Sequence, residues 1–318
     1  MSFSMEVKSE LAKLQPKRVC CQRAEASAII HMDGSLHILG NERFALDVST
    51  ENAAVARLLY KYLTDTFPLK VESIVRRSVL HKVNNYLIHI PDQPATGQVL
   101  NELGILDDHM VMAPGILQRV VKKDCCAVAY LRGAFLGGGF VSNPKSDYHF
   151  ELTTDNAEFA EDLRDLVRRV GLNAKISTRK KNFAVYNYAV YIKDSEEILQ
   201  YLALIGAYNA LLQWEDERIV KEIRAQVNRL VNCDTANLNK VVNAAAEQIK
   251  DIEIVDSKLG LENLPNSLQE FAGVRVEYPY VSLKELGELF NPPLSKSAVY
   301  HRARRMSQLA KSLLKVSR

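Results

Sequence analysis

Apolar positions between residues 20 and 210 switch between helical and strand spacing, in an order that occurs twice. Residues 49–67 have apolar side chains at the spacing of one helix face and lie between runs of strict alternation, which are typical of β-hairpins. Gly40 and Asn41 separate the first two alternating runs, as expected of a hairpin turn. The pattern predicts the order αββαββα in two halves, residues 20–106 and residues 125–207.

The first helix of each half has the same sequence features. Cys20–Leu36 (CCQRAEASAIIHMDGSL) and Cys125–Val141 (CCAVAYLRGAFLGGGFV) both begin with a cysteine pair, carry small residues at matching places and end in a Gly before a strand-like run. Small residues on one face let helix backbones approach closely. We predict that the two helices pack about a pseudo-twofold axis and that Gly34 and Gly139 form left-handed C-caps.

The segments outside the repeat are predicted to be helical. Residues 4–15 form a short amphipathic helix with Ser4 as N-cap, and residues 213–231 form a charged helix that leaves the repeated body. Residues 232–235 predict a turn and a fresh N-cap before a helix over 236–249. The predicted domains are an N-terminal helix (1–19), the duplicated body (20–210), a linker helix (211–231) and a C-terminal helical domain (232–318).

A helix-turn-helix is predicted over residues 282–311. Ser282 and Glu285 have the spacing of a capping box, which marks a helix start, and Gly287 allows close packing. Residues 291–293, Asn-Pro-Pro, end this helix, and Ser295 caps the next one. The side chains expected to point inward are Leu283, Leu286 and Leu289 in the first helix, and Val299, Ala303, Met306, Leu309 and Leu313 in the second.

The opposite face of the second helix is polar and basic, with no acidic residue after Glu288. This face suits a recognition helix in the DNA major groove, and the alternative is a basic amphipathic helix at a protein interface. The candidates for contact with base edges are Ser295, Lys296, Ser297, Tyr300 and His301. Arg304 is expected to reach guanine or phosphate, whereas Arg302, Arg305 and Lys311 are expected to neutralise phosphates. The predicted fold class is therefore α+β, a pseudosymmetric duplicated body followed by an all-α helix-turn-helix domain.

Composition and charge agree with a nucleic-acid partner for the C-terminal end. The 318 residues are 47% hydrophobic and 25% charged, which is typical of a globular protein, and the net charge is +3. Residues 265–318 contain nine Lys and Arg against four Asp and Glu, a net of +5, so the rest of the chain is at −2. Because no apolar run is long enough to span a membrane and the start is charged, we expect a cytoplasmic protein without membrane contact.

The cysteines are five in number, four of them in adjacent pairs, which is a poor disulfide framework. Reduced thiols are expected. A zinc site built from Cys20, Cys21, Cys125 and Cys126 requires the two helix starts to meet, and no CxxC spacing supports it. Small, buried and inert thiols are the favoured interpretation, so no metal or cofactor is predicted.

The repeat and its small-residue helices resemble the LAGLIDADG homing endonuclease fold over about residues 20–206. The resemblance implies a carboxylate at the foot of each motif helix, where the pair holds the divalent metals that cleave DNA. The position in the first copy is Asp33, and the matching position in the second is Gly138. One metal ligand is therefore missing, and Asp33 is interpreted as a cap or turn residue at a helix end, with no catalytic residue predicted.

In the same resemblance the two sheets form a saddle over DNA. Basic residues fall near the second hairpin of each half, where a saddle would meet phosphates or a partner protein. They are Arg76, Arg77 and Lys82 in the first half, and Lys175, Arg179, Lys180 and Lys181 in the second.

The segments NRLVNCDTANLNK (228–240) and SLKELGELFNPPLSKSAVYHRARR (282–305) are similar to characteristic segments of the WhiA family of Gram-positive bacteria. The resemblance covers nearly the whole chain. It implies a non-catalytic, nucleoid-associated protein that binds double-stranded DNA, as a transcriptional regulator or chromosome-associated factor in cell division, chromosome segregation or sporulation. Another transcription or division protein is a further expected partner. The alternatives are an active metal-dependent endonuclease and a protein-interaction scaffold.

Overall fold

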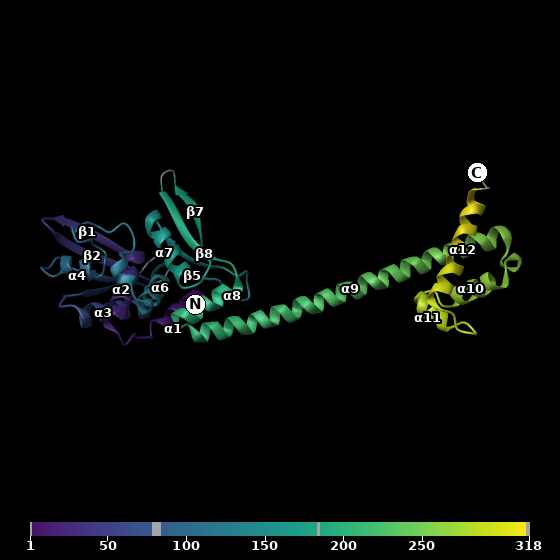
Figure 1. Cartoon of the computed structure of the whole chain (residues 1–318), viewed down its shortest axis with the longest axis horizontal. Helices are drawn as coiled ribbons and strands as arrows, with labels where there is room; N and C mark the ends of the chain where they lie inside the picture. The colour runs from purple at the N-terminus through teal and green to yellow at the C-terminus, as the bar shows by residue number, and fades with distance from the viewer. Residues whose placement is uncertain (1, 78–83, 183–184, 316–318) are drawn as a thin grey trace. The chain divides into compact units, whose positions relative to one another are not determined.

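The computed structural model describes residues 2–77, 84–182 and 185–315, and Lys82 of the predicted basic set lies outside them. The chain divides into two units, Met1–Val220 and Lys221–Arg318, and each is described here by itself. Figure 1 shows the first unit with its helices and sheets at the N-terminal end of the chain, and the second as a group of helices.

The first unit contains the duplicated order that the hydrophobic pattern predicts. The first half consists of α2 (Val19–Asp33), β1 (Gly34–Gly40), β2 (Arg43–Thr50), α3 (Ala53–Thr66), β3 (Glu72–Arg77), β4 (Asn84–Ile90) and α4 (Thr96–Glu102). After α5 (Gln118–Val121), the second half consists of α6 (Asp124–Gly138), β5 (Gly139–Val141), β6 (Phe150–Thr154), α7 (Ala157–Arg169), β7 (Lys175–Asn182), β8 (Val185–Ile192) and α8 (Ser195–Ile205).

Each half forms one four-stranded antiparallel sheet, in the orders β1-β2-β4-β3 and β5-β6-β8-β7. The registers of the two sheets match: Asp47 of β2 faces His89 of β4, and Glu151 of β6 faces Tyr191 of β8. Helices α3 and α7 each pack on their own sheet and leave its other face open. The duplication predicted from the sequence is confirmed.

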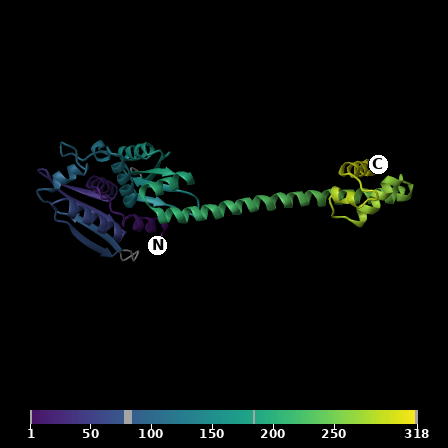
Figure 2. The same cartoon turned by 60° about the horizontal axis from the view of Figure 1, so that its bottom comes forward.

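The centre of the first unit is the pair α2 and α6, which pack side by side (Figure 1). Figure 2 shows the same unit turned by 60° about the horizontal axis. Small residues make this contact possible, as predicted. Ala24 and Ala28 are fully buried, and a side chain at Gly133 would place its Cβ 2.3 Å from the carbonyl oxygen of Glu25. The backbones therefore touch at Gly133, and even a methyl group there would force the helices apart.

The two glycines that end these helices do not form left-handed caps, so that prediction is wrong. Gly34 has a φ of −85° and Gly139 a φ of −79°, both in the extended region. Glycine is needed there for space, because a Cβ would lie 2.3 Å from the Ile30 carbonyl oxygen in the first case and 2.6 Å from that of Phe135 in the second. The chain passes directly from helix into strand at both positions.

The N-terminal helix α1 (Phe3–Leu11) packs into the first unit. Its N-cap is Ser2, so the prediction of Ser4 as cap is wrong. Ser4 is buried instead, where its Oγ donates to the Val141 carbonyl oxygen at 2.7 Å and accepts from the Val141 N–H at 2.9 Å. A hydroxyl that bridges to β5 is satisfied by tertiary structure, which no local pattern reveals.

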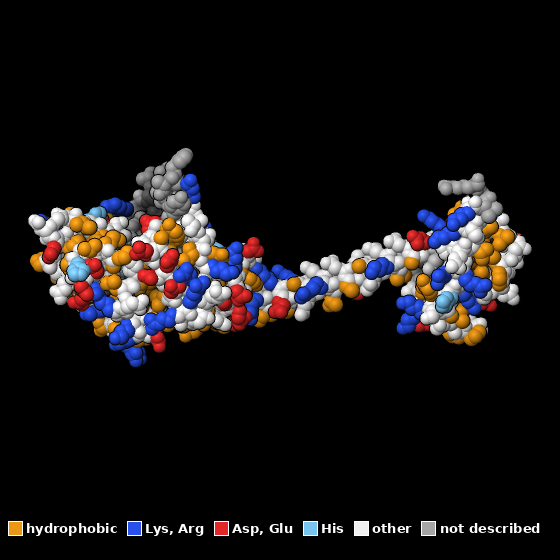
Figure 3. All heavy atoms as spheres, turned by 45° about the horizontal axis from the view of Figure 1, so that its top comes forward, with side chains coloured by type: hydrophobic (Ala, Val, Ile, Leu, Met, Phe, Trp, Pro, Cys, Tyr) orange, Lys and Arg blue, Asp and Glu red, His pale blue; other side chains and the backbone are white. Residues whose placement is uncertain are grey.

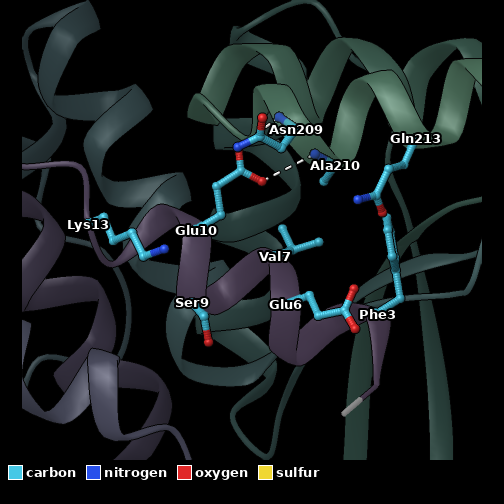
Figure 4. Close-up of a pocket in the computed structure, with 9 residues that line it drawn as sticks. All are labelled: Phe3, Glu6, Val7, Ser9, Glu10, Lys13, Asn209, Ala210 and Gln213. Atoms are coloured by element: carbon cyan, nitrogen blue, oxygen red, sulfur yellow. Dashed lines mark hydrogen bonds between the residues drawn. The ribbon is translucent and has the colours of Figure 1, made fainter.

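Helix α9 (Tyr208–Leu259) is continuous over 52 residues, so the predicted interruption at residues 232–235 is wrong. Asn, Asp and Thr cost a helix only a few tenths of a kcal/mol each, and the helix contains neither Gly nor Pro. Its start is capped by Glu10 of α1, whose carboxylate accepts from the N–H groups of Asn209 (2.8 Å) and Ala210 (3.2 Å) (Figure 4). Trp214, fully buried, fixes the first turns against Phe3.

The second unit packs α10 (Asn266–Glu277), α11 (Leu283–Glu288) and α12 (Lys296–Lys315) around the end of α9. The capping box of Ser282 with Glu285 is present as predicted. Leu289 was predicted to point inward but is 44% exposed, so that prediction is wrong. Because α11 ends at Glu288, Leu289 lies outside the helix, and Phe290 enters the core instead. The predicted stripe on α12 is buried or partly buried, and Ala310 joins it.

Candidate nucleic-acid interface

The helix-turn-helix consists of α11 and α12, held together by a close backbone contact. A Cβ at Gly287 would lie 2.3 Å from the carbonyl oxygen of Leu294, so the two backbones approach more closely than any other residue would allow. The Leu294 N–H donates to the Gly287 carbonyl oxygen at 2.8 Å. Ser295 caps α12, since its Oγ accepts from the Ala298 N–H at 3.3 Å. The Gly287–Leu294 contact and the Ser295 cap together fix the position of the N-terminus of α12, whose first residues are exposed.

The open face of α12 carries almost all of the predicted contact residues. Positions three and four apart share one face of a helix, and the exposed residues follow that spacing. Figure 3 shows Lys and Arg side chains gathered on the surface of the second unit. The exposed residues of this face, here called the α12 face, are Ser295, Lys296, Ser297, Tyr300, His301, Arg304, Arg305 and Lys311.

Arg302 is placed differently from the other predicted contacts. Its side chain is only 21% exposed, forms an ion pair with Glu270 of α10 at 3.0 Å, and lies over the Phe290 ring at 5.2 Å from the centroid. These contacts join α12 to α10 and neutralise the guanidinium charge within the unit. Arg302 therefore has a stabilising role that the sequence spacing did not indicate, because Glu270 lies 32 residues away.

One exposed cation near this face was not among the predicted residues. Lys284 lies in the first turn of α11 and is exposed. In helix-turn-helix proteins the first helix crosses the DNA backbone while the second enters the major groove. The position of Lys284 in the first turn of α11, next to the capping box, is the sequence signal that would have identified this residue as a candidate phosphate contact.

The open face of each sheet carries a carboxylate at the same position. Asp47 accepts from His37 Nε2 at 3.0 Å and from His89 Nδ1 at 2.6 Å. Partial burial acts to raise the pKa of Asp47, but the hydrogen bonds from the two histidines outweigh it and lower that pKa. Glu151, which occupies the matching register, contacts His149 at 2.9 Å and Arg179 at 2.6 Å. Both carboxylates are therefore ionised on a surface that was predicted to meet phosphates or a protein.

The predicted basic residues of the body divide between two sheet faces. Side chains alternate along a strand, so Arg76 shares the open face with Glu72 whereas Arg77 points to the opposite face. In the second sheet Lys175 and Arg179 share the open face with Glu151, and Lys180 lies on the other face. Lys181 lies in β7, but its side chain is outside the described part of the structure. The open faces are therefore mixed in charge.

The foot of the α2–α6 pair carries the predicted carboxylate, Asp33. Asp33 is the last residue of α2, at a helix end as predicted. Burial raises its pKa to about 6, against the opposing effect of the Lys8 ammonium. Lys8 also donates to the carbonyl oxygen of Gly137 in α6. At Gly138 a Cβ would lie 2.3 Å from Met32 Cε and 2.9 Å from the Thr153 carbonyl oxygen, so an acidic side chain does not fit there as the helices are packed.

At the opposite end of the same helix pair, the two cysteine pairs meet. The sulfur atoms of Cys20, Cys21, Cys125 and Cys126 all lie within 4.8 Å of one another. The condition on which the zinc alternative depended is met, and the cluster is the one group of three or more such ligands found in the described part of the chain. Within the same residues, no helix has both the length and the apolar character that a bilayer span requires.

Three family models match the chain in succession. They describe a WhiA N-terminal LAGLIDADG-like domain (residues 19–106), a WhiA LAGLIDADG-like domain (residues 127–224) and a WhiA C-terminal HTH domain (residues 227–310). The matched ranges correspond to the first half of the body, the second half with the start of α9, and the helical unit.

Similar proteins cover nearly the whole chain. A probable cell division protein WhiA of Desulforamulus reducens is 48% identical over 98% of this chain and 96% of its own length. The protein of the same description from Heliobacterium modesticaldum is 47% identical over 98% of this chain and 97% of its own. The crystal structure of full-length DUF199/WhiA from Thermotoga maritima has 27% identity and a TM-score of 0.58, covering 98% of this chain and 99% of that one.

Proposed function

Because this chain belongs to the WhiA family, we propose that it is a DNA-binding protein of cell division or sporulation, acting as a transcriptional regulator or chromosome-associated factor without nuclease activity. Double-stranded DNA is its main partner, and it associates with the nucleoid. The observation that supports this proposal most is the α12 face, where cap, turn and buried stripe present a polar, basic surface without a carboxylate.

The chemistry of the α12 face suits the major groove. Lys296 and Ser297 lie in the first turn of α12, the part of a recognition helix that reaches base edges. Tyr300 and His301 follow on the same face, with ring centroids 6.0 Å apart. Arg304 and Arg305 lie one turn further on, where guanidinium groups would meet phosphates on the groove rim.

The salt dependence of binding tests this proposal. Each phosphate contact contributes about 0.9 to the slope of log K against log salt concentration, so Arg304→Ala with Arg305→Ala is expected to weaken binding and to reduce the slope by up to about 2. The measurement is fluorescence anisotropy of the full chain on a labelled random-sequence duplex, over a range of salt concentrations.

A matched control removes two other guanidinium groups. Arg57→Ala with Arg168→Ala changes exposed side chains on α3 and α7, the outer helices of the body, and is expected to leave the slope unchanged. If the α12 double variant kept the wild-type slope, the α12 face would not be the DNA surface, and an interaction scaffold would be the better interpretation. Far-UV circular dichroism of each variant verifies that the fold is retained.

The absence of nuclease activity is proposed from the foot of the α2–α6 pair. A two-metal or one-metal cleavage site requires carboxylates that bridge the ion and an activated water. Of the two matched positions at the helix ends, Asp33 carries a carboxylate, with Lys8 beside it, and Gly138 leaves no room for one. We expect no nicking of plasmid DNA with Mg²⁺ or Mn²⁺; nicking that disappeared in Asp33→Ala would establish the endonuclease alternative.

A protein of transcription or division is the proposed second partner, bound by the open sheet faces of the body. The observation in favour is the ionised carboxylate at the centre of each face, Asp47 and Glu151, which repels phosphate but accepts donors from a protein surface. Crosslinking from an introduced photoreactive residue at Ser35 on the open face tests this; recovery of DNA instead of protein would assign the face to DNA.

A further inference from the structure

The four cysteines at the start of the α2–α6 pair form one compact group. Cys20 and Cys21 are the second and third residues of α2, and Cys125 and Cys126 have the same places in α6. Cys21 and Cys126 are buried, whereas their neighbours are partly exposed, so the group lies just beneath the surface. The duplication has brought two identical cysteine pairs to one point on the axis that relates the halves.

The spacing of the sulfur atoms suits a single metal ion. A tetrahedral Zn²⁺ site has Zn–S distances of about 2.3 Å, which places its four sulfurs about 3.8 Å apart. All four sulfurs here lie within 4.8 Å of one another, so small changes in side-chain torsion would bring them to that geometry. A set of four thiolates selects soft or borderline ions, of which Zn²⁺ is the divalent one that prefers a closed tetrahedral site.

The surroundings compensate the charge that such a site would carry. Four thiolates around a divalent ion have a net charge of about −2, and the cluster lies in the first turns of α2 and α6, where both helix dipoles have their positive ends. Neither helix has a side-chain cap, and both N-cap residues are basic, Arg18 and Lys123. Arg18 Nη1 already donates to the Cys125 sulfur at 3.5 Å.

Basic residues outnumber acidic ones around an adjoining cavity. This cavity of about 260 Å³ has Cys20 and Cys126 in its wall, together with four basic residues and one carboxylate that pairs with Arg23: Arg23, Arg119, Lys122, Lys123 and Glu102. Basic residues beside the sulfurs favour anionic sulfur ligands. Burial acts against them, since it raises the pKa of Cys21 to about 12 and that of Cys126 to about 11, so a metal ion that binds here must displace protons.

We propose that Cys20, Cys21, Cys125 and Cys126 bind one Zn²⁺ ion that joins the two halves of the body. The ion closes the end of the helix pair opposite Asp33, and its two ligands from α2 and two from α6 cross-link segments about a hundred residues apart. The site is structural, because all four coordination positions are filled by protein. The zinc site does not include the α12 face, so the proposal of a zinc site can be right or wrong independently of the proposal that α12 binds DNA.

The experiment uses the full chain, purified under reducing conditions, freed of metal with a chelator and titrated with Co²⁺ as a spectroscopic substitute for Zn²⁺. We expect one equivalent of Co²⁺ to bind, with the sulfur-to-cobalt charge-transfer bands and strong visible bands of a tetrahedral tetrathiolate site. Zn²⁺ should then displace the Co²⁺, and elemental analysis should find one Zn²⁺ per chain. Metal-free protein should have a lower Tm than the Zn²⁺ form.

Variants locate the site. Cys20→Ser with Cys125→Ser removes one ligand from each helix and should abolish the tetrathiolate spectrum and the metal-dependent rise in Tm. The matched control is Cys233→Ser, which changes the remaining cysteine, exposed on α9 and outside the cluster, and should leave stoichiometry and spectrum as in the wild type. DNA binding of the metal-free and Zn²⁺ forms, measured in parallel, separates this proposal from the function of α12.

Three results would overturn the proposal. The first is a reduced wild-type chain that takes up no Co²⁺ or Zn²⁺, a measurement that does not depend on any variant folding. The second is a spectrum that survives in the Cys20→Ser, Cys125→Ser variant. The third is a disulfide between the two pairs, detected by mass spectrometry of thiol-blocked protein as the loss of two hydrogens, because oxidised sulfurs cannot all ligate one ion.

Discussion

Replacing Arg132 by Leu is expected to destabilise the body more than removing any surface ion pair. The carboxylate of Glu25, in the middle of α2, is completely buried between the two motif helices. Arg132 of α6, with a side chain 12% exposed, donates from Nε to Glu25 Oε1 at 3.0 Å and from Nη2 to Oε2, and the Tyr62 hydroxyl donates to Oε2 at 3.3 Å. The pair joins one half of the body to the other.

The magnitude follows from what the substitution leaves behind. Arg132→Leu keeps most of the packing volume but strands a buried carboxylate without its counterion, which costs about 3–5 kcal/mol. A domain of this size is stable by about 5–15 kcal/mol, so the loss is a large part of the whole. Changing both partners, Glu25→Leu with Arg132→Leu, removes the stranded charge and is expected to cost far less than the sum of the single changes.

The assay is urea unfolding followed by tryptophan fluorescence. Trp214 is the one tryptophan of the chain and is fully buried in the first unit, so its emission reports unfolding of the body. The double-mutant cycle gives the coupling between the two residues directly. The control pair is Arg119 with Asp108, which are 40% and 78% exposed and should contribute at most about 1 kcal/mol.

Two outcomes would refute this reasoning. If Arg132→Leu lowered the free energy of unfolding by less than about 1 kcal/mol, the Glu25 carboxylate would be solvated or protonated without loss, contrary to its burial. If the double variant were as unstable as the sum of the single variants, the two residues would not be coupled, and packing of the stems would explain the losses.

Three further predictions concern single side chains. Burial lowers the pKa of His31 from 6.5 to about 4, so the stability that neutral His31 contributes is complete above about pH 6.5 and is lost as the pH falls toward 4. At pH 5 the free energy of unfolding is expected to have fallen by about 2 kcal/mol for this reason. His31→Gln should make this fall smaller, as measured by the urea midpoints at pH 7 and pH 5. The raised pKa of Asp33 makes the protein more stable as the pH falls, which opposes the effect of His31. The variant is therefore compared with the wild type at each pH. Glu10→Ala, which removes the cap of α9, should cost about 1 kcal/mol and speed amide exchange at the start of α9, whereas Glu6→Ala in the same pocket should do neither. Gly287→Ala should destabilise the second unit by about 1–3 kcal/mol and weaken DNA binding, since its Cβ meets the Leu294 carbonyl oxygen.

Features with a local cause were predictable from the sequence. The two spacings, about 3.6 and 2, identify the helices and hairpins of both halves, and the capping box at Ser282 depends on residues three apart. Most of the α12 face follows from the same periodicity. These features are set by neighbours within a few residues, so one sequence is enough to find them.

Features with a distant cause were not predictable. The ion pair of Arg302 could not be foreseen because its partner Glu270 lies on another helix, and Ser4 was predicted as a cap because its partner, the Val141 backbone, is distant in the sequence. The cap-forming residues at 232–235 predicted a break, but they lie inside α9, because no Gly or Pro there ends the helix. The meeting of the two cysteine pairs could not be read from their spacing, because it depends on how α2 packs against α6.

The α2–α6 pair explains why the body and the C-terminal unit have different chemistry. At the foot of the pair Lys8 lies beside Asp33, and the contacts around Gly138 leave no space for a second acidic side chain. Further along the pair, the buried Glu25–Arg132 bond crosses between the halves, and four thiols meet at the other end. Each of these contacts lies where one half of the body meets the other. Such a body is suited to hold two sheet surfaces in a constant relation, and in the proposed function the exposed cations of the α12 face make the contact with DNA.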